Sequence, residues 1–180
     1  MPNIITVVRI LFAPAMVWAL LADAGEGGPL RWLALALFVV GISSDAVDGH
    51  LARSRNLITD LGKLLDPIAD KALTGAALIG LSLLGELPWW VTGLILAREL
   101  GITLWRLVEA KRIVLPAGRG GKLKTVLQAV AISLALAPFP ALLGDWMHWV
   151  NTATMALALV VTLWSGADYL VRAYWRPTKR

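Results

Sequence analysis

Long apolar stretches separated by short polar joins constrain this chain more than any other feature. About 20 apolar residues are enough for a helix to cross a membrane, and six stretches qualify as candidates: residues 5–22, 30–44 (continuing to about 53), 68–84, 89–108, 126–143 and 150–171. Only 16% of the residues are charged, whereas soluble domains average about a quarter. Short joins make neighbouring helices antiparallel. We therefore predict a single domain over residues 1–180, an all-α integral membrane bundle of six transmembrane helices.

Basic residues orient this predicted bundle. If both termini are cytoplasmic, the basic residues of the termini and of the joins near 53–65 and 109–125 all face the cytoplasm: Arg53, Arg55, Lys63, Lys111, Arg112, Arg119, Lys122, Lys124, Arg172, Arg176, Lys179 and Arg180. Arg31 is then the only basic residue at an outer join, as the positive-inside rule requires. An interfacial aromatic belt is expected at the outer ends, formed by Trp32, Trp89, Trp90, Trp146 and Trp149. We predict cytoplasmic termini.

Other features of the composition limit the alternatives. Residues 22–24 read Ala-Asp-Ala after an apolar stretch, so the first span has a second interpretation as a cleaved signal peptide, although the first eight residues lack a basic start. The net charge of +5 suits loops that face anionic lipid. Nucleic-acid binding is not expected, because no basic stripe alternates with aromatic residues. With no cysteine, disulfides, thiolate metal sites and a cysteine nucleophile are excluded.

Four aspartates stand where the second and third predicted spans meet the cytoplasm. Asp45 and Asp48 are three residues apart, and Asp66 and Asp70 are four apart, so each pair shares a helix face. Charge in a membrane span is costly and usually functional. Four converging carboxylates repel one another unless they are neutralised, and oxygen-only ligands favour Mg²⁺ or Mn²⁺. Solvated helix ends, or a proton relay in a transporter, remain alternative interpretations.

The residues around the aspartates suggest a phosphate chemistry. Gly49 and Gly62 permit close approach of a ligand to the backbone. Ala52 is small, and the guanidinium of Arg53 can bind two oxygens of one phosphate. Pro67 suits the first turn of the third helix. Metal, arginine and accessible backbone together are typical of phosphoryl transfer.

Residues 45–70 read DAVDGHLARSRNLITDLGKLLDPIAD. This resembles the complete signature of the CDP-alcohol phosphatidyltransferase family: D-x-x-D-G-x-x-A-R, eight residues, then G-x-x-x-D-x-x-x-D. The resemblance implies a six-helix fold, usually homodimeric, with two metal ions on the substrate pyrophosphate. It assigns the metal ions to Asp45, Asp48, Asp66 and Asp70. It also implies that the CDP-lipid pocket is lined by Asp45, Asp48, Gly49, Ala52, Arg53, Gly62 and Asp66. Asp70 is also expected to take the proton of the attacking hydroxyl.

Four shorter segments are similar to the bacterial phosphatidylglycerophosphate synthase branch of that family: residues 2–9 (PNIITVVR), 95–99 (ILARE), 121–125 (GKLKT) and 162–165 (TLWS). The resemblance implies transfer of the phosphatidyl group from CDP-diacylglycerol to glycerol 3-phosphate, with release of CMP, in a bacterial cell membrane. Candidates for binding the acceptor phosphate are Thr6, Arg9, Arg98, Arg119, Lys122 and Lys124. One departure is Ser44, where many members carry threonine.

Several of these assignments have a plainer alternative. Arg98 and Glu99 lie deep in an apolar helix and can form an internal ion pair, and Lys122 and Lys124 can be positive-inside anchors. Lys71 either neutralises the aspartates or extends to the interface. Inositol phosphate, serine and phosphatidylglycerol are alternative acceptors. A carboxylate-lined ion carrier is disfavoured, because the acidic residues collect at one end instead of spreading across the membrane.

Overall fold

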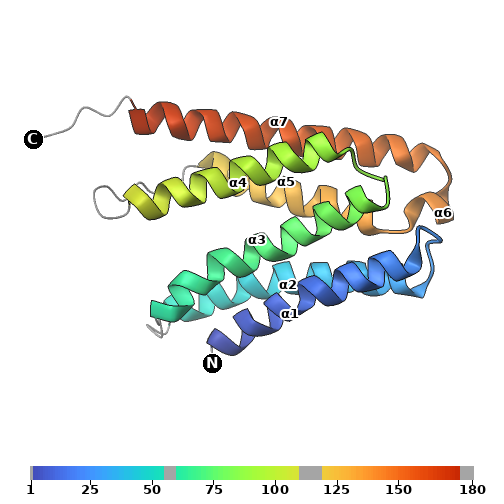
Figure 1. The fold of residues 1–180 in the computed structure, drawn as a ribbon, viewed down its shortest axis with the longest axis horizontal. Helices are drawn as coiled ribbons and strands as arrows, with labels where there is room; N and C mark the ends of the chain where they lie inside the picture. Colours follow the sequence, from blue (N-terminus) through green and yellow to red (C-terminus); the bar gives the residue numbers. More distant parts are fainter. Residues whose placement is uncertain (1, 55–59, 110–118, 175–180) are drawn as a thin grey trace, which may run out of the picture.

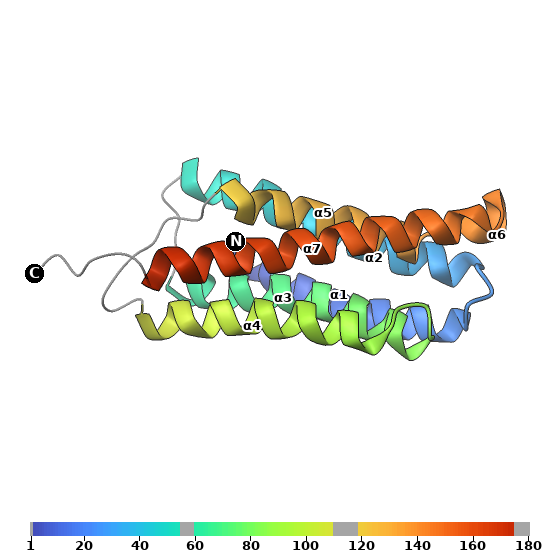
Figure 2. The same ribbon diagram turned by 90° about the horizontal axis from the view of Figure 1, so that it is seen from above.

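The computed structural model describes residues 2–54, 60–109 and 119–174, and these residues are helical apart from short turns (Figure 1). Side chains are described for residues 8–44, 71–105, 121 and 123–172. The helices are α1 (Pro2–Asp23), α2 (Pro29–Ser54), α3 (Asp60–Leu83), α4 (Trp89–Glu109), α5 (Arg119–Leu136), α6 (Phe139–Leu143) and α7 (Trp146–Tyr174). Helix α6 is short, and the others run along one bundle (Figure 2). The prediction of an all-α chain is confirmed.

The long helices form one continuous bundle with two distinct ends. Helix α1 packs along α2 and α3, α5 packs along α7, and α4 contacts both α3 and α7. The end of α2, the start of α3, the end of α4 and the start of α5 lie at one end, toward which α1 begins and α7 ends (Figure 1 and Figure 2). We call it the motif end, because the two halves of the 45–70 motif reach it. The opposite end, where α2, α4 and α7 begin, is the tryptophan end, and it carries Trp32, Trp89, Trp90, Trp146 and Trp149.

Apolar side chains cover the outside of the bundle. Leu94 and Leu104 of α4, and Leu157 and Val160 of α7, are between 42% and 62% exposed. The buried polar residues include Arg9, Glu99, Lys124, Gln128, Thr162 and Ser165. A soluble helix bundle has the opposite arrangement, with polar residues outside, whereas an apolar exterior is suited to contact with lipid.

The described helices differ in how closely their length and hydropathy match those of a membrane-spanning helix. Within the described residues, one segment, Trp146–Arg172 of α7, is long and apolar enough by itself to cross a membrane. Shorter apolar helical segments occupy Pro29–Ser44, Lys71–Leu83 and Leu123–Leu136. The six predicted spans therefore correspond to six long helices, of which one meets the criterion for a span on its described residues alone.

Two glycines allow α1, α2 and α3 to approach closely. A methyl group on Gly41 of α2 would lie 2.5 Å from Cδ2 of Leu73 on α3. A methyl group on Gly80 of α3 would lie 2.8 Å from Cδ2 of Leu20 on α1. Small residues are used in this way to bring helix backbones together in membrane bundles. The close packing fixes α2 and α3, whose ends carry the aspartate motif.

The predicted fifth helix is wrong in its boundaries. Residues 126–143 were expected to form one helix, but α5 begins at Arg119 and ends at Leu136, and residues 139–143 form the separate helix α6. Pro138 has no backbone N–H and disfavours the helical conformation at Ala137, so the helix ends before it. The earlier start of α5 places Lys124 inside a helix.

The predicted start of the third helix is also wrong. Pro67 was assigned to the first turn, but α3 begins at Asp60, so Pro67 lies inside the helix. Residues 60–66 include leucine and lysine, which favour helix, and an aspartate at the first position interacts favourably with the helix dipole. The expected continuation of the second helix is confirmed, because α2 extends to Ser54.

A buried ion pair joins three segments at the tryptophan end. Arg31 is 5% exposed, and its guanidinium binds the carboxylate of Glu86 with two hydrogen bonds, Nη1 to Oε1 being 2.6 Å. The same guanidinium donates Nε to the carbonyl of Leu136 at 3.0 Å and Nη2 to that of Ala135 at 2.8 Å. Arg31 therefore satisfies carbonyls at the end of α5 that have no partner within the helix.

Candidate functional site

The backbone brings both halves of the aspartate motif to the motif end. Asp45 and Asp48 lie in the last turns of α2, Asp66 and Asp70 lie in the first half of α3, and the two helices are in contact. Their side chains lie outside the described residues, as do those of Gly49, Ala52, Arg53 and Gly62. The predicted metal and CDP-lipid site therefore stays a prediction. Among the described side chains, no group of three or more histidines or acidic residues is placed to hold a metal ion.

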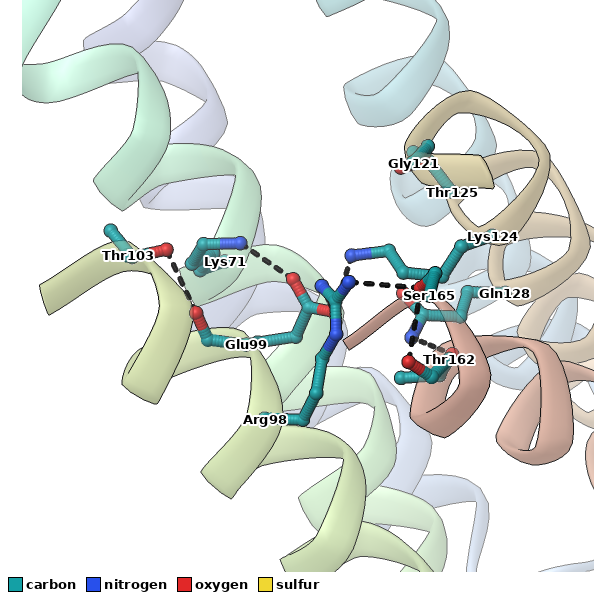
Figure 3. A network of polar contacts seen from close by, with 10 residues as sticks. All are labelled: Lys71, Arg98, Glu99, Thr103, Gly121, Lys124, Thr125, Gln128, Thr162 and Ser165. Carbon is teal, nitrogen blue, oxygen red and sulfur yellow. Dashed lines mark hydrogen bonds and ion pairs between the residues drawn. The ribbon is translucent and has the colours of Figure 1, made fainter. Parts of the chain in front are cut away.

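Glu99 lies at the centre of a buried network that starts next to Asp70 in the sequence (Figure 3). Lys71 of α3 donates Nζ to Oε2 of Glu99 at 2.7 Å, and Arg98 of α4 donates Nη1 to Oε1 at 3.0 Å. Lys124 of α5 also donates Nζ to Oε1. The side chains of Glu99 and Lys124 are each 8% exposed. One carboxylate thus accepts charge-assisted hydrogen bonds, the stronger kind, from cations on three helices.

The network continues from α4 to α7. Arg98 donates Nη2 to Oγ of Ser165 at 2.9 Å, and Ser165 donates its hydroxyl to the carbonyl of Thr162 at 3.0 Å. Gln128 of α5 donates Nε2 to Oγ1 of Thr162 at 2.7 Å. A methyl group on Gly166 would lie 3.1 Å from Cγ and Nε of Arg98, so the arginine side chain crosses α7 where that helix has no side chain. Polar contacts therefore connect α3, α4, α5 and α7.

Helical periodicity explains why these polar side chains point inward. On α4, Ile95, Glu99 and Ile102 are all buried, and their spacing of four and three residues defines one face. On α5, Lys124 and Gln128 are four residues apart and both buried. Glu99 and Lys124 therefore occupy positions that the pattern of the surrounding residues assigns to the core.

A small pocket opens beside Glu99, between α2, α3, α4 and α5. Its lining is Ile42, Lys71, Thr74, Gly75, Leu96, Glu99, Leu100, Lys124, Thr125, Gln128 and Ala129. The side that is formed by α3, α4 and α5 thus carries two lysines, a carboxylate, an amide and two hydroxyls. Apolar side chains, among them Ile42, Leu96 and Leu100, line the rest, so the pocket places charged and polar groups beside an apolar surface.

The structure describes the side chains of three of the six residues predicted to bind the acceptor phosphate and brings two of these three together. Arg98 and Lys124 meet at Glu99 (Figure 3), and the interpretation of Arg98 and Glu99 as an internal ion pair is confirmed. Arg9 is buried on α1, near Gly41 of α2. The side chains of the other candidates lie outside the described residues: Thr6, Arg119 and Lys122.

The network corrects one prediction about a lysine; the other, that Lys71 neutralises the aspartates, stays a prediction because the aspartate side chains lie outside the described residues. Lys124 is buried and bound to Glu99, so its interpretation as an interfacial anchor is wrong. Lys71 was expected to neutralise the aspartates or extend to the interface, but in the described part of the chain its ammonium group binds Glu99, a partner that was not considered. Both lysines are held by a single carboxylate because α3, α4 and α5 present them from different sides.

Three residues of the network received no role from the sequence: Gln128, Thr162 and Ser165. A signal for each was present. Gln128 follows Lys124 by four residues, and Thr162 and Ser165 are three residues apart within an apolar helix, so each pair shares one face. A polar face in an otherwise apolar helix of a membrane bundle usually turns toward other helices.

Comparison with known proteins gives consistent matches over nearly the whole chain. The model of the CDP-alcohol phosphatidyltransferase family matches residues 1–164. A relative from Mycobacterium tuberculosis (strain CDC 1551 / Oshkosh), named probable phosphatidylglycerophosphate synthase, is 47% identical over 171 residues, which cover 95% of this chain and 80% of the relative. A relative from Bacillus subtilis (strain 168), named CDP-diacylglycerol–glycerol-3-phosphate 3-phosphatidyltransferase, is 37% identical, with 94% of this chain and 92% of the relative covered. A relative of the same name from Shigella flexneri serotype 5b (strain 8401) is 33% identical, with 96% and 93% covered.

Proposed function

The chain belongs to the CDP-alcohol phosphatidyltransferase family, and from this premise we propose that it transfers the phosphatidyl group of CDP-diacylglycerol to glycerol 3-phosphate. The products are phosphatidylglycerophosphate and CMP. Relatives named for this reaction align along more than nine tenths of the chain.

One observation supports an acceptor that carries a phosphate, and the names of the relatives favour glycerol 3-phosphate over inositol phosphate. The segments that resemble the glycerol 3-phosphate branch, residues 95–99, 121–125 and 162–165, lie far apart in the sequence and meet in one buried network. They supply Arg98, Glu99, Lys124, Thr162 and Ser165. The network includes Lys71, which follows the last aspartate of the family signature. A basic cluster next to that signature is suited to an acceptor that carries a phosphate.

The CDP-lipid is assigned to the motif end of α2 and α3. The pocket for it is formed by Asp45, Asp48, Gly49, Ala52, Arg53, Gly62 and Asp66. The metal ligands are Asp45, Asp48, Asp66 and Asp70, and this role is supported by the backbone positions of the four residues, which lie toward the same end of two helices in contact. Such oxygen ligands suit Mg²⁺ or Mn²⁺. When bound, two such ions neutralise the pyrophosphate and stabilise the leaving CMP.

The acceptor is assigned to the basic residues beside this pocket. Its phosphate is held by Arg98 and Lys124 together with the candidates at the motif end: Thr6, Arg9, Arg119 and Lys122. Asp70 accepts the proton of the 1-hydroxyl as that oxygen attacks the phosphorus that carries the lipid. Asp70 and Lys71 are consecutive in α3, and the acceptor carries its hydroxyl and its phosphate at opposite ends of a three-carbon chain. The phosphate is proposed to lie near Lys71 and the hydroxyl near Asp70.

The bundle is proposed to cross the bacterial cytoplasmic membrane six times, with the motif end and both termini in the cytoplasm. The apolar exterior and the tryptophans at one end support this orientation. Because the chain has no cysteine, a maleimide labels only the single cysteine that is introduced into each variant. We expect Asp145→Cys to react with a membrane-impermeant maleimide in intact cells and Arg172→Cys to react only after permeabilisation. The reverse pattern would contradict the orientation.

Residues 1–180 are proposed to act as one domain and to assemble as a homodimer in the membrane. The single domain is supported by contacts of α2 and α3 with α5 and of α4 with α3, which connect the first half of the chain to the second. The dimer is an expectation from the family resemblance. Light scattering of the purified protein in detergent should give twice the mass of one chain, and the mass of one chain would refute the dimer.

Release of CMP by the purified protein tests the function directly. CDP-diacylglycerol and Mg²⁺ or Mn²⁺ are supplied, and glycerol 3-phosphate, inositol phosphate, serine and phosphatidylglycerol are offered separately. We expect CMP with glycerol 3-phosphate alone, and no CMP after addition of EDTA. Turnover with a different acceptor would retain the family chemistry and refute the proposed acceptor.

A further inference from the structure

Three cations share one carboxylate in the network around Glu99. Lys71, Arg98 and Lys124 contribute three positive charges and Glu99 one negative charge, so these four residues carry a net charge of +2. All four side chains are mostly buried, with exposed fractions from 8% to 21%. Buried charges are costly unless they are paired. Among the described side chains, the positive charges of these four residues are therefore incompletely neutralised, and this charge balance suits a further anion.

Space for that anion lies next to the carboxylate. The ammonium-bearing side chains of Lys71 and Lys124 line the pocket together with Glu99, and Thr74, Thr125 and Gln128 add hydroxyl and amide groups. A phosphate monoester carries a charge of about −1.5 to −2 near neutral pH. This charge is opposite and nearly equal to that of the four-residue network.

We propose that the carboxylate of Glu99 occupies the place of the acceptor phosphate while the site is empty. This inference rests on the function proposed above. Carboxylate and phosphate oxygens accept hydrogen bonds from the same donors. On binding, the phosphate displaces Glu99 from Lys71 and Lys124. Arg98 keeps its position, because Ser165 holds it and its side chain crosses α7 at Gly166.

The exchange has two opposite consequences. While the site is empty, Glu99 stabilises the protein by pairing cations that would otherwise be buried without a partner. When phosphate is present, the same carboxylate competes with it for the two lysines, so Glu99 weakens phosphate binding. A residue with a purely structural role would have only the first effect, and this difference makes the proposal testable.

The test is thermal denaturation of the purified full-length protein in detergent, without CDP-lipid, over a series of inorganic phosphate concentrations. For Glu99→Gln we expect a lower Tm without phosphate and a phosphate Kd about tenfold lower than that of the wild type, because a competing charged hydrogen-bond acceptor has been removed. A Kd that is unchanged or higher would overturn the proposal. If Glu99→Gln does not fold, Glu99→Asp replaces it, because aspartate keeps the carboxylate on a shorter side chain. We expect Glu99→Asp to lower the phosphate Kd by a smaller factor, and an unchanged Kd would refute the proposal equally.

Glu86→Gln is the matched control, because it removes the partly buried carboxylate that pairs with Arg31 at the opposite end of the bundle. It should lower Tm without changing the Kd for phosphate. An equal decrease of the Kd in this control would overturn the proposal. Phosphatidylglycerol in mixed micelles distinguishes a lipid phosphodiester from a phosphate monoester: we expect no stabilisation that depends on Glu99, and such stabilisation would refute the assignment to the acceptor phosphate.

Enzyme kinetics separate this inference from the proposed function. Glu99→Gln should lower KM for glycerol 3-phosphate about tenfold, with no increase in kcat. A wild-type protein that fails to release CMP with glycerol 3-phosphate would refute the proposed function, whatever the phosphate titration gives. A wild-type protein that is active, together with an unchanged phosphate Kd and KM in Glu99→Gln, would refute only the role of Glu99.

Discussion

The bundle contains two buried ion-pair systems, one at the tryptophan end and one between the middle of the bundle and the motif end, and the two systems differ in their balance of charge. At the tryptophan end, Arg31 faces one carboxylate, that of Glu86, and its remaining donors bind backbone carbonyls at the end of α5. Toward the motif end, Glu99 in the middle of α4 faces three cations, two of which line an adjacent pocket. Among the described side chains, the charges of the first system balance, whereas those of the second have an excess of positive charge beside a small pocket.

This difference separates a structural role from a binding role. A charge-balanced pair needs no anionic ligand, and the contacts of this pair connect the first turn of α2, the turn between α3 and α4, and the end of α5. A buried cluster with uncompensated charge is costly to the fold, and a bound anion removes part of that cost. The comparison predicts that substitutions at the motif end change substrate binding and turnover, and that substitutions at the tryptophan end change stability.

The largest effect is expected at Asp70, the proposed base. Asp70→Asn keeps the size of the side chain but cannot accept a proton, so kcat for CMP release should fall by about 10² to 10⁴. Binding of CDP-diacylglycerol, measured by equilibrium titration, should be largely retained. Loss of binding as well would assign Asp70 to metal binding only.

The second effect tests the other end of the bundle. Glu86→Gln leaves the guanidinium of Arg31 buried without a charged partner, and we expect it to lower the free energy of unfolding by about 1 to 3 kcal/mol. Thermal denaturation in detergent measures the loss as a decrease in Tm. KM for glycerol 3-phosphate should not change, and a marked increase in KM would remove the distinction between the two ends.

A smaller effect is expected at Gly166. In Gly166→Ala the new methyl group would lie 3.1 Å from Arg98, so the arginine must move by a few tenths of an ångström. Because displacements of about 1 Å cost on the order of 10²-fold in rate, a movement of this size should change kcat/KM by about threefold. Gly93 on α4 has open space beside it, and Gly93→Ala is the control that should leave kcat/KM unchanged.

The smallest effect is expected at Asp168. Its carboxylate binds Nε of Arg172 at 2.8 Å on the exposed surface of α7, one helical turn away. Exposed pairs of this kind contribute about 0.3 to 0.5 kcal/mol. Asp168→Asn should therefore shift Tm by little and leave CMP release unchanged. A large loss of activity would mean that the motif end extends further along α7 than the network around Glu99.

The sequence predicted the parts of this molecule that depend on local patterns. Apolar stretches predicted the six long helices. The spacing of the motif aspartates assigned them to two neighbouring helices, and the backbone places Asp45 and Asp48 near the end of α2 and Asp66 and Asp70 in the first half of α3. Errors arose where a local signal has two meanings. Pro67 is compatible with a helix start and also with a position inside a helix. The apolar stretch that includes Pro138 was read as one helix, whereas the chain forms two helices there, α5 and α6.

Contacts between distant segments were the parts that the sequence could not provide. Arg98 and Lys124 were recognised as basic residues suited to phosphate, but their common partner Glu99 and the contact of Lys71 with it depend on how α3, α4 and α5 pack. The same holds for Arg31, whose carbonyl partners on α5 are more than a hundred residues away. Side-chain direction along one helix is periodic and predictable, whereas the partner across an interface is not.

The most direct test of the contrast between the two ends is KM for glycerol 3-phosphate, measured by CMP release at saturating CDP-diacylglycerol in Lys124→Gln and Glu86→Gln. Lys124→Gln removes one cation from the motif end and should raise KM about tenfold or more, since hydrogen bonds between charged groups are the strong ones. Glu86→Gln should leave KM at the wild-type value while lowering Tm. Equal KM values in the two variants would contradict the assignment of the motif end to acceptor binding and of the tryptophan end to stability.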